Sequence, residues 1–590
     1  MSKPRGDSFD QHSAAMRWSL VLGVASIVVG LVLLIDPFRS IGTLRWLVAL
    51  GLAITAVNEL TSPSLASRMQ SRVIAGLWLG AALVAVTWPG ISVQQLAAVI
   101  GISLAAGGLI KLISATKAAP GSRAVLAISG LTNVVVGVLV VSWPAITVLI
   151  VALLAGLRTI VFGVGQLLTL RHPAAEEAIP EANPDAPRSL WSNAMRLVGA
   201  VVALVLALAG VVISAALHDA QPDEPTAFYL APSPLPDGPP GTIIRSEVMD
   251  GQYANAITYR VLYLSTALDG SPTAVSGYIV VPNSAAPAGG RKVLAYTHGT
   301  VGVSPRCAPS LTGPGADPLA FEGGDRFVAD GYVIAATDYQ GLGTPGPHPY
   351  LVGTVEAMNA LDSVRAARNL SQAQAGSAFA VWGHSQGGHA ALFTSQMAAS
   401  YAPELQLQGV AAGGPVPDLV ELFKVNIETQ VGKILISMAL SSWARVYNLD
   451  LAQVATPAAQ VIIDKIAMNC LYDPTQILGS VPGSLTLNLT FLRVPLWEVE
   501  PWKTIVQANN PGNAPIGVPI LIAQGDADPI VAPATTEALV QRLCTRGEDV
   551  ELLIAPGVGH IDLSKVVSEQ VADWIADRFA GVASASECNA

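Results

Sequence analysis

Seven apolar stretches fill the first 217 residues, and each is about long enough to cross the hydrocarbon core of a bilayer as a helix. They run near 18–35, 43–59, 73–88, 94–114, 124–142, 145–168 and 195–217. The sequence is 51% hydrophobic and only 13% charged, which fits a chain that lies partly in lipid. We therefore expect an all-α transmembrane bundle of about seven helices. The first stretch has no obvious cleavage site and is followed by further spans, so it is predicted to be an anchor rather than a signal peptide.

Three of these stretches end alike, which indicates an internal repeat. Asp36–Pro37, Trp88–Pro89 and Trp143–Pro144 each close an apolar run and precede a short polar turn and another run. Proline ends a helix at the interface, and tryptophan suits the headgroup region. Over about 17–170 the three hairpins resemble the HdeD-like family of short-repeat membrane proteins, linked to acid resistance. The resemblance implies a domain of six helices within 1–170 and transfers no catalytic residues.

The distribution of basic residues predicts the orientation in the membrane. Lysine and arginine are concentrated at the N-terminus and near the segments after the second, fourth and sixth stretches: Lys3, Arg5, Arg17, Arg68, Arg72, Lys111, Lys117, Arg123, Arg171, Arg188 and Arg196. The loops after the third and fifth stretches carry none, and the loop after the first carries Arg39. By the positive-inside rule the N-terminus is cytoplasmic, so seven spans place everything after His218 outside the plasma membrane. Three polar residues of the spans, Arg158 within the sixth and Asn58–Glu59 at the end of the second, are expected to face the bundle or the interface rather than form a functional site.

Cysteine usage points to the same compartment. The four cysteines all lie in the second half of the chain: Cys307, Cys470, Cys544 and Cys588. An even number confined to one segment suggests disulfides in an oxidising compartment, although four unpaired thiols and three different pairings are compatible with the sequence. Their spacing fits no zinc motif, so no metal is expected. The formal net charge is −10 without a long basic run, which argues against a nucleic-acid partner.

The membrane part ends in two linkers. The Pro- and acid-rich segment 171–194 is predicted to be a cytoplasmic linker before the seventh helix, 195–217. A second linker, 218–240, leads to a domain over 241–590.

The alternation of strand and helix patterns over 241–590 predicts an α/β fold. Short β-rich runs are expected at 256–264, 275–281, 292–297, 331–336, 378–383, 518–523 and 549–554. Helical patterns follow at about 354–370, 386–400, 534–546 and 562–579. Continuous apolar strands separated by helices predict a mainly parallel sheet covered on both faces.

The sequence Trp382–Gly388, WGHSQGG, contains Gly-x-Ser-x-Gly at the junction of a predicted strand and a predicted helix. This setting is typical of a nucleophile elbow, in which a strained turn exposes the serine hydroxyl. Glycines on both sides of Ser385 allow the strand and the helix to pack closely. Ser385 is therefore the candidate nucleophile.

A serine nucleophile needs a base, and the base needs an acid that orients it; in this fold the chain order is Ser, Asp or Glu, then His. Asp528 follows a predicted strand, and His560 follows the last one in a glycine-rich loop. We assign Asp528 as the acid and His560 as the base. His384 and His389 are the alternatives for the base, and Asp526 is the alternative for the acid. Asp562 is close to His560 in the sequence but is expected to cap the last helix.

The oxyanion requires two backbone donors. One is expected to be the amide of Gln386, which follows the nucleophile. The other is assigned to the amide of Thr300, with its hydroxyl as a further candidate, in the loop after the strand 292–297. Gly299 is the alternative donor.

Several ordered motifs together resemble the secretory lipase family of α/β hydrolases over about 226–590. They are AYTHGT from Ala295, CAPS from Cys307, ATDYQGLG from Ala336, GHSQGG from Gly383, GDAD from Gly525, and Gly559–His560. Carried over motif by motif, the resemblance implies Ser385 as nucleophile, Asp528 as acid and His560 as base. It also implies disulfides Cys307–Cys470 and Cys544–Cys588.

The insertion at about 415–510 carries amphipathic helical stretches and is predicted to be a helical cap that forms the acyl pocket, rather than a purely structural insertion. The sequence thus predicts a membrane-anchored extracytoplasmic serine carboxylesterase or lipase that needs no cofactor. An envelope acyltransferase or peptidase on the same residues, and a non-catalytic lipid sensor, are the alternatives. The expected partners are an ester or lipid substrate and membrane lipids, and no specific protein partner is inferred.

Overall fold

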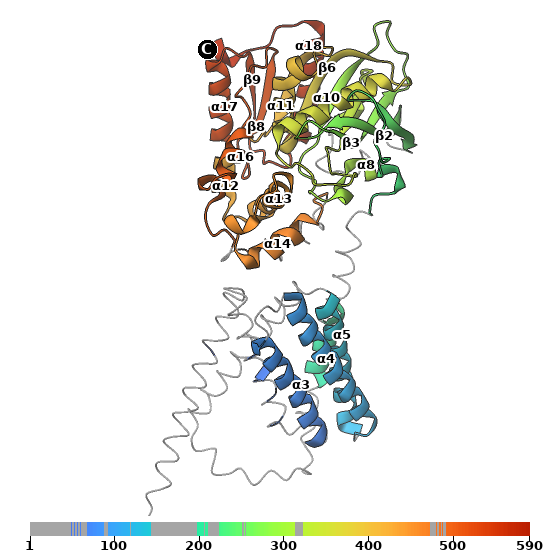
Figure 1. Cartoon of the computed structure of the whole chain (residues 1–590), viewed down its shortest axis with the longest axis vertical. Helices are drawn as coiled ribbons and strands as arrows, with labels where there is room; N and C mark the ends of the chain where they lie inside the picture. Colours follow the sequence, from blue (N-terminus) through green and yellow to red (C-terminus); the bar gives the residue numbers. More distant parts are fainter. Residues whose placement is uncertain are drawn as a thin grey trace, which may run out of the picture. The chain divides into compact units, whose positions relative to one another are not determined.

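In the computed structural model the chain forms two compact units, Met1–His218 and Asp219–Ala590 (Figure 1). The structure describes 68–87, 93–118, 120–142 and most of 197–209 in the first unit, besides six isolated positions before residue 68. In the second unit it describes 224–589, apart from 250–252, 254, 313–322 and most of 473–490.

Three long helices make up most of the described part of the first unit: α3 (Arg68–Thr87), α4 (Val93–Thr116) and α5 (Pro120–Ser142). They coincide with the predicted spans 73–88, 94–114 and 124–142. Within the described residues, two helical segments are long and apolar enough to cross a membrane, Ala98–Thr116 and Arg123–Val141. Ser71–Thr87 and Leu197–Ala209 are shorter apolar helices.

Most of the other spans predicted for this unit lie outside the residues that the structure describes. The predicted spans 18–35, 43–59 and 145–168 lie outside the described residues apart from isolated positions, and so do Arg158 and Asn58–Glu59. The predicted span 195–217 is described only over part of its length.

Helices α4 and α5 contact each other through glycines. Gly101 and Gly108 of α4 face Gly137 and Gly130 of α5, so each helix contributes two glycines that are two turns apart. A Cβ atom at Gly108 would lie 2.6 Å from the carbonyl oxygen of Gly130, and one at Gly101 would lie 2.6 Å from that of Gly137. The two backbones therefore touch directly, and small residues permit the same close packing in membrane bundles.

Replacing Gly108 by valine is expected to separate α4 from α5, because a side chain cannot occupy the space of the Gly130 carbonyl. After heating in detergent, the Gly108→Val protein should lose its monodisperse peak in size-exclusion chromatography at a lower temperature than the parent. Gly80→Val is the control, since a Cβ there meets no atom within 4 Å in the described part of the chain. Equal midpoints for both variants would contradict this packing.

The second unit is built on one sheet of nine strands in the order β1-β2-β3-β5-β4-β6-β7-β8-β9. The strands are β1 (Ile243–Met249), β2 (Ala256–Thr266), β3 (Pro272–Pro282), β4 (Arg291–Thr297), β5 (Val333–Thr337), β6 (Ala375–His384), β7 (Gln406–Gly413), β8 (Ile520–Gly525) and β9 (Val550–Ala555). Along the sheet, the pairs β1–β2, β2–β3 and β3–β5 are antiparallel. The remaining pairs, from β5–β4 to β8–β9, are parallel. All seven predicted strands occur, and β1 and β7 are additional. The sheet is thus mixed, with the parallel part that the sequence predicts.

Helices cover both faces of this sheet. Alternating residues of each central strand point to opposite sides, so that Val293 of β4 belongs to one apolar cluster and Leu294 to the other. The first cluster is closed by α10 (Gly353–Asn369), α11 (Gln386–Tyr401) and α17 (Pro533–Thr545). The second is closed by α9 (Gly324–Ala329) and α18 (Leu563–Ala580). Both faces are therefore buried, which accounts for the nearly continuous apolar strands.

A helical insertion lies between β7 and β8, where the cap was predicted. Its helices are α12 (Leu419–Asn426), α13 (Gln430–Val446), α14 (Pro457–Ala467) and α16 (Trp502–Ala508). Figure 1 shows α13 and α14 together at one end of this unit. Their buried side chains form a third apolar cluster, which includes Trp443 and also Tyr350, Leu351 and Val352 from the segment before α10. The cap therefore packs on the segment that leads into α10.

Two disulfides cross-link segments of the second unit. The structure pairs Cys307 with Cys470 and Cys544 with Cys588, as the family resemblance implied. The first joins the segment after β4 to the cap beyond α14. The second joins α17 to the C-terminal segment.

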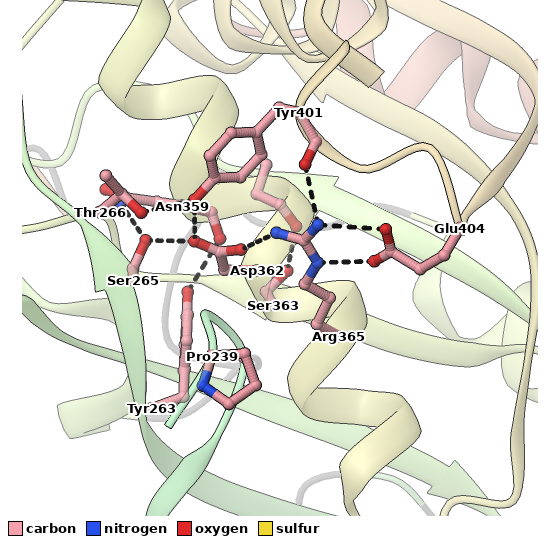
Figure 2. Close-up of polar contacts among 12 residues, drawn as sticks. Pro239, Tyr263, Ser265, Thr266, Asn359, Asp362, Ser363, Arg365, Tyr401 and Glu404 are labelled. Carbon is pink, nitrogen blue, oxygen red and sulfur yellow. Dashed lines mark hydrogen bonds and ion pairs between the residues drawn. The ribbon is translucent and has the colours of Figure 1, made fainter. Parts of the chain in front are cut away.

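A buried polar network fixes α10 to its neighbours (Figure 2). Asp362 of α10 accepts hydrogen bonds from Ser265 of β2 at 2.7 Å and from Tyr401, at the end of α11, at 2.9 Å. Arg365 pairs with Asp362 at 2.8 Å and with Glu404 at 2.7 Å. Burial raises the pKa of Asp362 to about 6 despite these bonds. The network ties β2, α10 and the far end of α11 together.

Candidate active site

The candidate nucleophile lies in a sharp turn between β6 and α11. Ser385 has φ 60° and ψ −120°, a conformation that costs a non-glycine residue on the order of 1–3 kcal/mol. A Cβ atom at Gly383 would lie 2.1 Å from the Thr297 hydroxyl oxygen, and one at Gly387 would lie 1.9 Å from the Thr297 carbonyl oxygen. Both glycines of the motif are therefore required by the close approach of β4, and the turn has the geometry of a nucleophile elbow.

His560 joins the serine to an acid. Its Nε2 lies 2.8 Å from the Ser385 Oγ, and its Nδ1 lies 2.7 Å from Asp528 Oδ2. Because an ionised carboxylate only accepts hydrogen bonds, Nδ1 carries a proton and Nε2 is free to accept the serine proton. The structure thus brings together the three residues that the sequence singled out, in the order that a serine nucleophile requires.

Asp528 is held as a buried carboxylate. Its Oδ1 accepts the amides of Ile530 at 2.8 Å and Val531 at 2.9 Å. Burial acts to raise the pKa of Asp528, but the hydrogen bonds from His560 and from these amides outweigh it, and the net pKa lies below its ordinary value. The group therefore stays ionised at neutral pH and fixes the His560 tautomer.

The alternative histidines occupy other positions. His389 is engaged elsewhere, with Nδ1 at 2.8 Å from Glu356 and Nε2 at 2.8 Å from the Asn509 carbonyl oxygen. The His384 ring packs against the His560 ring, with centroids 4.7 Å apart. Burial lowers the pKa of His384 to about 3, so its ring is neutral. Among the described residues, only His560 has a ring nitrogen within hydrogen-bonding distance of Ser385 Oγ.

The alternative acids also lie apart from the histidine. Asp526 is exposed and accepts the Gly557 amide at 2.5 Å, so it links the loops that follow β8 and β9. Asp562 stands at the N-cap position of α18, as expected, but its side chain makes no capping hydrogen bond.

The candidate oxyanion donors surround the serine. Gln386 is the first residue of α11, so its amide has no acceptor within the helix. A Cβ atom at Gly299 would lie 3.8 Å from the Ser385 Cβ, which places the loop 298–300 beside the nucleophile. In the described part of the chain, neither Gly299 nor Thr300 has an amide hydrogen bond to protein, so both amides are available.

Two side chains that sequence reasoning missed support these donors. The Thr300 hydroxyl lies 2.9 Å from the Tyr350 hydroxyl, and Gln386 Nε2 donates to Glu356 at 2.8 Å. Both residues are buried, and they belong to the stretch that leads into and begins α10: Tyr350 lies just before the helix and Glu356 in its first turn. No local motif marks that segment, and only the fold brings it next to the serine.

The fold and the site define a protein of the α/β-hydrolase class. Residues 325–587 match the family described as secretory lipase. Residues 21–81, 73–140 and 128–178 match the family described as "Short repeat of unknown function (DUF308)". The chain therefore carries a secretory lipase domain at its C-terminal end and three short repeats at its N-terminal end, which confirms both parts of the family resemblance.

Individual relatives match about three fifths of this chain. A Mycobacterium tuberculosis protein named "Probable inactive lipase MT1628" is 24% identical over 379 residues, or 61% of this chain and 82% of that protein. Lipase A of Arthroderma benhamiae is 24% identical over 405 residues, covering 62% and 82%. The crystal structure of Candida antarctica lipase A superposes with a TM-score of 0.53 at 21% identity, covering 63% of this chain and 90% of that one. This likeness establishes the shared fold.

Asp528→Asn is expected to lower the hydrolysis of an activated ester by about 10⁴-fold in kcat, because an amide that donates to Nδ1 leaves His560 in the wrong tautomer. Asp526→Asn is the matched control, since it changes the neighbouring acid that does not touch His560. Ester hydrolysis by both purified variants is measured beside the parent. A larger loss for Asp526→Asn would reverse the assignment.

Proposed function

We propose that this protein is a membrane-anchored serine carboxylesterase or lipase that cleaves acyl esters through an acyl-enzyme on Ser385. The observation that carries the proposal is the continuous hydrogen-bonded series Ser385–His560–Asp528 at a strained elbow. A binding module has no need of a nucleophile, base and acid in this order. The secretory lipase match supports an ester or lipid as the substrate class.

In the proposed reaction, His560 Nε2 takes the proton of Ser385 Oγ as that oxygen attacks the ester carbonyl carbon. The carbonyl π electrons move to oxygen, and the amides of Gln386 and Thr300 stabilise the charge. The ester C–O bond then breaks, and His560 gives its proton to the leaving alcohol. Water then attacks the carbonyl carbon of the acyl-enzyme, and His560 again acts as the base. The bond to Ser385 Oγ breaks, His560 returns the proton to that oxygen, and the carboxylic acid is released.

We further propose that the hydrolase unit lies outside the cytoplasm, behind seven membrane spans. Three observations support this placement: the basic residues of the short loops, the two helical segments long and apolar enough to span, and the two disulfides. Disulfides persist in oxidising compartments. The acceptor is proposed to be water; an acyltransferase or peptidase on the same residues would use another acceptor.

A non-catalytic lipid sensor is the second candidate, because one relative carries the name "Probable inactive lipase MT1628". In this chain all three residues are present, and His560 lies within hydrogen-bonding distance of both Ser385 and Asp528. Catalysis is therefore the function that the geometry favours here.

The full-length protein in detergent is expected to release p-nitrophenol from p-nitrophenyl esters of graded chain length. Ser385→Ala should lower kcat by about 10⁶-fold, toward the background that remains when the nucleophile is absent. Ser395→Ala, which removes a buried hydroxyl from the middle of α11, is the matched control and should retain activity. Turnover that persists in Ser385→Ala would exclude the serine mechanism, and inactivity of the parent on every ester would favour the sensor.

The proposed topology is testable with reporter fusions in a bacterial host. Alkaline phosphatase fused after Pro222 is expected to be active and green fluorescent protein at the same position dark, because each reporter matures on only one side of the membrane. Fusions after Pro180, in the predicted cytoplasmic linker, should give the opposite result. Fluorescence at Pro222 would place the hydrolase unit in the cytoplasm.

A further inference from the structure

The segment before α10 lies between the cap and the oxyanion loop. Tyr350 is buried, and its hydroxyl lies 2.9 Å from the Thr300 Oγ1. Its backbone is held by two consecutive residues of cap helix α13. The Tyr350 amide donates to Ser442 Oγ at 3.0 Å, and Trp443 Nε1 donates to the Tyr350 carbonyl oxygen at 2.8 Å.

A third bond fixes the same segment. The Ser442 hydroxyl donates to the carbonyl oxygen of His348 at 2.6 Å, so one cap serine bridges two positions of the segment. Ser442 and Trp443 are both buried, so water does not compete with these bonds. The backbone of Tyr350 is therefore held by α13.

Either hydroxyl can donate in the Tyr350–Thr300 hydrogen bond. In the part of the chain that the structure describes, neither hydroxyl has another hydrogen-bond partner. If Thr300 donates, the buried phenolic proton of Tyr350 has no protein acceptor; if Tyr350 donates, the Thr300 proton has none until an acceptor enters the site. Burial raises the pKa of Tyr350, so the phenol keeps its proton. An oxygen atom bound beside the loop 298–300 would accept the Thr300 proton, so a bound ester favours the arrangement in which Tyr350 donates to Thr300.

We infer that Tyr350 is a positioning residue that orients the Thr300 hydroxyl as a third oxyanion donor, and that cap helix α13 holds Tyr350 in place. The inference rests on the proposed function, since it assigns Thr300 to the same oxyanion. A Thr300 rotamer that accepts from Tyr350 presents its proton on the side away from the phenol. The neighbouring Gly299 lies against Ser385, so this is the loop where the ester oxygen acquires its charge.

The cap affects the chemical step through bonds to the backbone of Tyr350, besides any contact that it makes with substrate. A variant that loosens α13 from Tyr350 should therefore lower kcat while leaving KM nearly unchanged, which is the signature of an interaction made in the transition state.

A double-mutant cycle on full-length protein in detergent tests this inference, with p-nitrophenyl butyrate as substrate. Tyr350→Phe keeps the ring and removes the hydroxyl, and Thr300→Val keeps the β-branched shape and both backbone groups. Each variant is expected to lower kcat by roughly ten- to a hundredfold and to change KM by no more than about twofold. This loss in kcat is smaller than that expected when a main oxyanion donor is removed. In the Thr300→Val background, Tyr350→Phe should have no further effect, whereas Thr300→Ser should retain the sensitivity.

Two more variants separate positioning from stability. Trp443→Phe removes the bond to the Tyr350 carbonyl oxygen and should lower kcat in the same direction. Tyr401→Phe removes a half-buried hydroxyl at the far end of α11 that donates to Asp362 of α10, and it should leave kcat unchanged (Figure 2).

Additive effects of Tyr350→Phe and Thr300→Val, or full activity of Tyr350→Phe beside an inactive Ser385→Ala, would overturn this inference and leave the proposed function standing. A parent protein without serine-dependent turnover would overturn both.

Discussion

The direct packing of strand β4 against the Ser385 turn is the contact on which the site depends. The Thr297 hydroxyl donates to the carbonyl oxygen of Gly387 at 2.8 Å, and both glycines of the motif lie against Thr297. A side chain at Gly383 or Gly387 would push α11 away from the sheet. Because the loop carrying Thr300 begins one residue after Thr297, the same contact sets the distance from the nucleophile to the oxyanion donors.

The parallel part of the sheet explains how distant residues meet. Loops after β4, β6, β8 and β9 carry Thr300, Ser385, Asp528 and His560, and the carboxyl ends of parallel strands share one edge. The strand order turns at β5-β4-β6, where ligand sites of open α/β sheets form. The antiparallel strands β1 to β3 extend the sheet without contributing to this edge, so the mixed topology leaves the site intact.

Much of this organisation follows from the sequence, and the exceptions have physical reasons. Apolar runs separated by helical patterns predict the parallel strands, and Gly-x-Ser-x-Gly with later Asp and His predicts which side chains meet. Strand β7 was missed because QLQGVAAG lacks β-branched runs and is a strand only by its place between β6 and β8. Tyr350 and Glu356 could not be foreseen, because their roles come from tertiary contacts that leave no local pattern.

The central claim is that His560, oriented by Asp528, makes Ser385 nucleophilic. Reaction with a fluorophosphonate, followed by peptide mass mapping, measures this directly, since the reagent bonds to activated serines and needs no knowledge of the natural ester. One adduct on the peptide that contains Ser385, lost in His560→Ala, is the expected result. Absence of the adduct in the parent protein, or equal labelling of the His560→Ala variant, would contradict the account.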